Sequence, residues 1–123
     1  MPRIQSLLPV ILLGLSVSVG LYLGYQFLQR RRNRPALIAL HILPGLAALE
    51  VIAMLLRGTP GGVSASSSTV IKASALLLVI GLIVGLLTPM VARDRPRTVA
   101  TVALGVHALL AATAFGLLLV WLA

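Results

Sequence analysis

Apolar residues fill four long stretches of this chain, and nearly every charged residue lies between them. The ranges 4–29, 73–92 and 98–123 contain no charged side chain, and the range 36–56 contains one, Glu50. A helix needs about 20 mostly apolar residues to cross the ~30 Å hydrocarbon core of a bilayer. The pattern therefore predicts an all-α fold, a four-helix transmembrane bundle. The expected helices run over approximately 6–29, 36–57, 69–91 and 98–122.

The connections between these helices are short, apart from a Gly- and Ser-rich loop over 58–68. Short connections make successive helices antiparallel neighbours, so we expect two antiparallel hairpins within a single integral membrane domain over 1–123. Apolar residues make up 59% of the 123 residues and charged residues 10%. Soluble domains average about 25% charged residues, so lipid is the expected solvent.

The net charge of +8 comes mainly from two short turns. Arginines gather beside the cytoplasmic face of membrane proteins, near anionic head groups, so this distribution argues against nucleic acid as a partner. We expect the turns 30–35 and 92–98 on the cytoplasmic side, with both termini outside. Arginine is nine times as frequent as lysine, which is typical of a bacterial protein and suggests a cytoplasmic or photosynthetic membrane. The topology-setting residues are Arg30, Arg31, Arg32, Arg34, Arg93, Arg95 and Arg97.

Two histidines are the first candidates for chemistry, because ionisable residues inside membranes usually have a function. His41 lies six residues after Pro35 and His107 eleven after Pro96. At ~1.5 Å per residue, the two depths are roughly 9 and 16 Å, both in the inner half of the membrane. Small residues flank both, which leaves room for a flat macrocycle, and imidazole is an axial ligand of haem iron. The depth difference of ~7 Å argues against one shared iron.

A structural interpretation of the histidines stays open beside this one. Buried histidines form hydrogen bonds between membrane helices. Pro44 has no N–H, so the carbonyl of Leu40 loses its usual donor. His107 is one candidate to replace that donor.

Glu50 is the remaining charge inside a span. It lies seven residues before Arg57, roughly 10 Å inside the outer end. Lys72 is at a similar level in the next helix, so we predict a Glu50–Lys72 ion pair, with Arg57 as the second candidate partner. The alternative is a transporter in which Glu50 relays protons or cations.

Two small-xxx-small motifs mark candidate packing faces. Gly20 and Gly24 form the first, and Gly81 and Gly85 the second. This spacing lets helix backbones approach closely in lipid. The motifs repeat at a spacing of 61 residues, as do the two basic turns, which suggests a duplicated hairpin. The two histidines do not correspond at that spacing.

No other pattern indicates an active site. The chain has no nucleophile with an adjacent base, no phosphate-binding loop, no His-Glu-x-x-His zinc motif and no cysteine. An enzyme with its own catalytic centre is therefore not expected. The leading interpretation is a non-catalytic accessory subunit of a larger bacterial respiratory or photosynthetic membrane complex, with other membrane subunits and the lipid bilayer as its partners.

Several short motifs follow one another in an order that resembles a known group. The sequence contains Leu-Gly-Tyr25, an Arg-rich turn, Leu40-His41-x-x-Pro44-Gly45, the second glycine motif, a basic turn and Val106-His107. In this order of motifs the chain resembles a group of small four-helix membrane proteins that are themselves distantly similar to cytochrome b561. The resemblance implies haem b ligation by His41 and His107 and electron transfer in the membrane. Cytochrome b561 proteins carry two haems on four histidines, whereas this chain has two histidines, which limits it to one bis-His haem.

Overall fold

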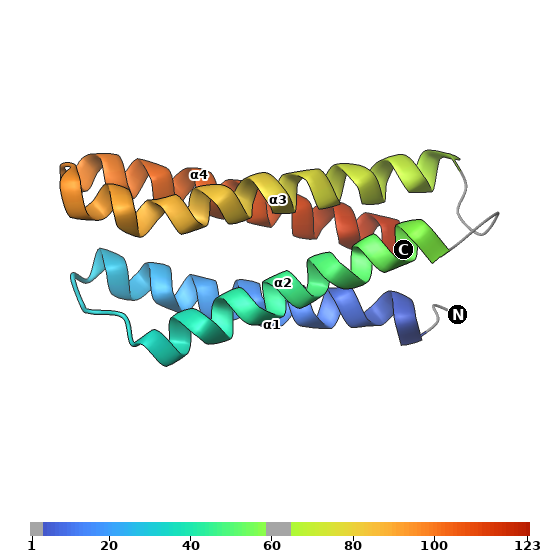
Figure 1. Ribbon diagram of the computed structural model, residues 1–123, viewed down its shortest axis with the longest axis horizontal. Helices are drawn as coiled ribbons and strands as arrows, with labels where there is room; N and C mark the ends of the chain where they lie inside the picture. The colour runs from blue at the N-terminus through green and yellow to red at the C-terminus, as the bar shows by residue number, and fades with distance from the viewer. Residues whose placement is uncertain (1–3, 59–64) are drawn as a thin grey trace.

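The four expected helices are present in the computed structural model, which describes residues 4–58 and 65–123. Within those ranges the chain is helical with no strands, so the predicted all-α fold is confirmed (Figure 1). Each helix is long and apolar enough to cross a membrane. The helices are α1 (Ile4–Leu28), α2 (Pro35–Gly58), α3 (Ala65–Asp94) and α4 (Arg97–Leu122).

The third helix differs most from its expected boundaries. It begins at Ala65 and ends at Asp94, whereas the sequence pattern predicts 69–91. The three serines that suggest a loop instead lie in its first turn, where serine is well tolerated because it suits helix N-termini. The remainder of the 58–68 loop lies largely outside the described residues.

The helices pack as two pairs. Helix α1 lies mainly against α2, and α3 mainly against α4 (Figure 1). The first pair (α1 and α2) joins the second pair (α3 and α4) through smaller contacts of α1 with α4 and of α2 with α3. The interface between the two pairs is therefore less extensive than the interface within each pair.

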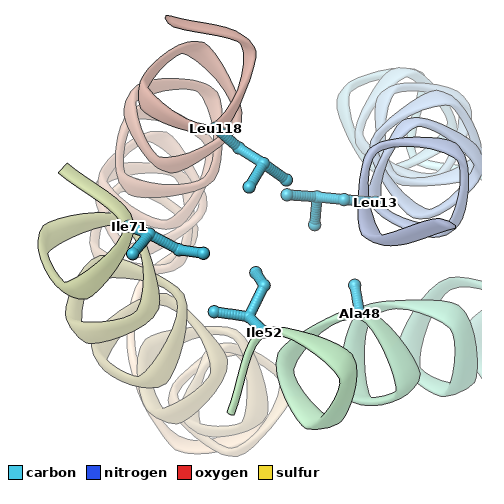
Figure 2. Close-up of a cluster of buried hydrophobic side chains, with 5 residues drawn as sticks. All are labelled: Leu13, Ala48, Ile52, Ile71 and Leu118. Carbon is cyan, nitrogen blue, oxygen red and sulfur yellow. The ribbon is translucent and has the colours of Figure 1, made fainter. Parts of the chain in front are cut away.

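A cluster of buried apolar side chains joins all four helices toward the end of the bundle that holds the chain termini. The side chains point toward one another across the bundle (Figure 2). In lipid, such contacts stabilise the fold by close packing rather than by removing apolar surface from water. The cluster consists of Leu13, Ala48, Ile52, Ile71 and Leu118.

Arg97 connects the two pairs at the opposite, basic end. Its guanidinium donates hydrogen bonds to the carbonyl oxygens of Phe27 and Leu28, the latter at 3.4 Å, and lies 4.6 Å from the centre of the Phe27 ring. The last carbonyls of a helix have no partner inside the helix, so this arginine from α4 caps the C-terminus of α1. Sequence reasoning gives Arg97 only a role in membrane orientation.

Replacing Arg97 by alanine is expected to lower the stability of the bundle by about 1 kcal/mol, because the cap and the cation–π contact are both lost. Thermal unfolding in detergent measures the change. Arg95→Ala is the matched control, since it removes the same charge two residues away from an exposed side chain. We expect less than about 0.5 kcal/mol for the control; equal losses in both variants would show that charge, not capping, is responsible.

Candidate functional site

The two histidines meet at the interface between the helix pairs. His41 on α2 and His107 on α4 have ring centroids 5.9 Å apart, and their ring planes are nearly perpendicular, at 86°. The expected ~7 Å offset in depth therefore does not keep them apart. Counted from the observed helix starts, His107 is still ten residues into α4 and His41 six residues into α2, yet the two rings meet. Depth counted from each helix start is not depth within the bundle.

Backbone and side-chain groups of α1 hold the His41 ring in place. Nδ1–H of His41 donates to the carbonyl oxygen of Ser16 at 2.8 Å. The hydroxyl of Ser16, which is 4% exposed, donates to the carbonyl oxygen of His41 at 2.6 Å, so its oxygen lone pairs are left to face Nδ1 at 3.3 Å. The ring lies directly over Gly20, where a Cβ would stand 2.7 Å from Cε1 of the imidazole. Only glycine gives the ring this position.

The second helix pair holds His107 in the same way. Nδ1–H of His107 donates to the carbonyl oxygen of Gly81 at 2.7 Å. A Cβ at Gly85 would stand 2.7 Å from Cε1 of that imidazole. Nδ1 of His107 is thus engaged within its own helix pair, so the structure gives no support to the expectation that His107 serves the Leu40 carbonyl.

The two histidine environments share one contact pattern, to which the Ser16 hydroxyl adds a further contact at His41. In each pair, the acceptor carbonyl lies four residues before the glycine beneath the ring. Ser16 and Gly20 correspond to Gly81 and Gly85 at a spacing of 65 residues, and the histidines correspond at 66. The contact pattern thus repeats about one helical turn away from the 61-residue spacing of the sequence motifs. The histidines still do not correspond at 61 residues, but their contacts do correspond.

The hydrogen bonds fix which ring nitrogen is available. A carbonyl oxygen only accepts, so each neutral imidazole carries its proton on Nδ1 and leaves the lone pair on Nε2. Metal-ligating histidines characteristically donate their other ring N–H to a backbone carbonyl or carboxylate, which fixes ring orientation and raises ligand basicity. One metal at ~2 Å from a nitrogen of each ring would separate the centroids by roughly 6 Å, close to what is found.

The donor set distinguishes among metal groups. The described residues contain no cluster of three or more His, Cys, Asp or Glu side chains, so a bare ion would find at most two ligands of these kinds there. Haem needs only two, since its macrocycle supplies the other four nitrogens and histidine is a usual axial ligand. The pair of anchored imidazoles therefore fits a bis-His haem better than an isolated metal ion.

Glu50 and Lys72 are not part of the histidine site. Both side chains are exposed on the outside of the bundle, and among the described residues no hydrogen bond or ion pair joins them. The ion pair stays a prediction. A relay through the bundle needs its carboxylate to face the interior or a water-filled cavity, so the exposed position of Glu50 gives the transporter interpretation no support.

The glycine motifs divide between the site and the outer surface. Gly20 and Gly85 lie beneath the imidazoles, and Gly81 is buried, where an added Cβ would stand 3.6 Å from the Leu110 Cβ. Gly24 has no other atom within 4 Å of a built Cβ, so it faces outward. Ser16 is the functional residue that sequence reasoning missed. A serine four residues before Gly20 in an apolar span is the signal that could have revealed it.

Comparison of the chain with protein-family models, with characterised proteins and with solved structures gave no match. The class of the protein is therefore stated from its fold and site alone. This is a small membrane protein of four apolar helices in which each helix pair contributes one anchored histidine to a common contact.

Proposed function

We propose that the protein is a small membrane cytochrome in which His41 and His107 bind a single b-type haem. The observation that supports this most strongly is the pairing of the two imidazoles, with each Nδ1 bound to a backbone carbonyl and their ring centroids 5.9 Å apart. Haem iron, when bound, alternates between the ferric and ferrous states and so carries one electron. The chain itself has the task of holding and orienting the two ligands.

The residues around each histidine account for this task. Ser16 and Gly81 supply the acceptors that engage Nδ1 and leave each Nε2 lone pair available to a metal, while Gly20 and Gly85 leave space for the rings. The apolar helices exclude water, which affects the reduction potential because a dry site disfavours the net charge on the oxidised iron. With the arginine turns at the cytoplasmic face, the histidines lie in the inner half of a bacterial membrane. Electron transfer across the membrane then requires a partner.

An absorption spectrum tests this function. The protein, purified from a haem-replete bacterial host, is expected to contain one haem per chain and to show a sharp α-band after reduction with dithionite. A colourless protein with intact helical structure would contradict the proposal.

A second function, that of a subunit in a larger respiratory or photosynthetic complex, is favoured by the open glycines on the outer surface. Gly24 on α1, and Gly105 and Gly116 on α4, have nothing within 4 Å of a built Cβ. Small residues on an outward face allow another membrane helix to approach closely. This role is compatible with haem binding. Purification in mild detergent followed by mass spectrometry should recover stoichiometric membrane subunits; purification without any such subunit would oppose it.

A further inference from the structure

Glu50 is a membrane-span carboxylate for which the described residues of a single copy provide no hydrogen bond or ion pair. It lies in α2, seven residues inside the end of the span Pro35–Arg57, which corresponds to roughly 10 Å of depth. Its side chain is exposed, on the surface that faces lipid in an isolated bundle. Carboxylates within membrane spans are costly there and almost always face a protein interior or pair with a cation. The surroundings of one copy do not meet that requirement.

Lys72 presents the complementary charge at a matching level. It lies four residues into the span Ser68–Asp94, at a depth of roughly 6 Å from the same end, and is also exposed. Its four-carbon stem can cover the remaining difference in depth. No contact within the described residues links Lys72 with Glu50.

The outer faces around both charges are apolar. One turn deeper than Glu50, Leu46 is 41% exposed, and one turn deeper than Lys72, Leu76 is 61% exposed. A surface that combines one acid, one base and exposed leucines is self-complementary, because a two-fold axis along the membrane normal places the acid of each copy opposite the base of the other. Two ion pairs then form, and both charges are removed from lipid.

We propose that this face of α2 and α3 is the interface of a homodimer, in which Glu50 of each copy pairs with Lys72 of the other. The occupant of the face is a second copy of this chain. The proposal is independent of whether the histidines bind haem.

Charge reversal in two differently tagged copies tests the pairing. Copies that both carry Glu50→Lys, or both carry Lys72→Glu, place like charges opposite each other twice. We expect their co-purification to fall more than about tenfold relative to the wild type, because like-charge contacts at an interface cost several kcal/mol. Mixing a Glu50→Lys copy with a Lys72→Glu copy restores two opposite-charge pairs, so the mixed dimer is expected to recover.

The mixture is the decisive arm because pairing inside one copy is not rescued by a second copy. Loss in both single variants without recovery in the mixture would overturn the dimer and support pairing within one chain. Undiminished co-purification of the single variants, or wild-type copies that do not co-purify, would overturn it as well.

Cysteine cross-linking adds a test that does not depend on the charges, since the natural chain has no cysteine. In the proposed dimer, α2 of one copy runs antiparallel to α3 of the other, so Leu46 lies opposite Leu76. A Leu46→Cys copy mixed with a Leu76→Cys copy is expected to form an intermolecular disulfide on oxidation. Leu109→Cys on α4, where the native side chain is 69% exposed, is the control and should remain unlinked to either.

Discussion

Replacement of either His41 or His107 by alanine is expected to reduce the haem content of the purified protein more than tenfold. In the proposed cytochrome each imidazole would supply one of the two protein ligands, and the described part of the chain offers no third histidine, cysteine or carboxylate beside them. Even the groups that only orient a metal ligand typically contribute 10–100-fold in affinity, so the ligand itself should contribute at least as much. The haem-to-protein ratio after purification measures the effect.

The double variant makes this prediction specific. If both imidazoles bind one iron, losing the second after the first should have little further effect, because residues that act as one unit are not additive. Val106→Ala, beside His107 but exposed at 44%, is the control for general disturbance of α4 and should retain its haem. Full haem content in either single histidine variant would rule out the bis-His assignment.

The second large effect is expected from glycine substitutions beneath the rings. Gly20→Ala and Gly85→Ala each introduce a Cβ 2.7 Å from an imidazole carbon. The ring can move away only by giving up its Nδ1–H bond to the carbonyl of Ser16 or Gly81. Overpacking costs about 1–3 kcal/mol, and the displaced ligand should lower haem retention about tenfold or more. Thermal unfolding and haem content together measure both consequences.

Two other glycines inside the helices provide controls. Gly24 in α1 and Gly105 in α4 meet nothing within 4 Å, so Gly24→Ala and Gly105→Ala add a methyl group without a clash. Alanine in a helix interior is favoured over glycine by about 0.5–1 kcal/mol, so these variants should be neutral or slightly stabilised. Equal stability and equal haem content in all four glycine variants would show that the close approach of the rings to Gly20 and Gly85 does not matter for haem binding.

The helices themselves could be predicted from the sequence because hydrophobic length decides membrane insertion directly. Three of the four begin and end within about two residues of their expected positions, as in α2, which was expected over 36–57 and runs from Pro35 to Gly58. The third is longer because the serines before Thr69 are part of its first turn. Polar residues next to an apolar span do not by themselves reveal where a helix begins.

The site was predicted only in part. The sequence identified the two histidines but did not predict that their rings lie in contact. Their relative depth depends on how the helices are staggered, and a count from each helix start does not contain that information. The glycines were equally ambiguous. Because Gly20 and Gly24 are one turn apart, as are Gly81 and Gly85, both glycines match at a spacing of 61 and Gly20 also matches Gly85 at 65. Only packing shows that Gly20 and Gly85 play the same part. The role of Ser16 depends on a partner 25 residues away.

Electron paramagnetic resonance of the oxidised wild-type protein is the measurement that tests the paired-histidine site most directly. Two imidazole ligands produce low-spin ferric haem, and ring planes near the observed 86° produce a strongly anisotropic signal rather than the rhombic signal of parallel rings. We expect that signal at one spin per chain. A high-spin ferric signal, or no haem signal from a correctly folded protein, would contradict the site.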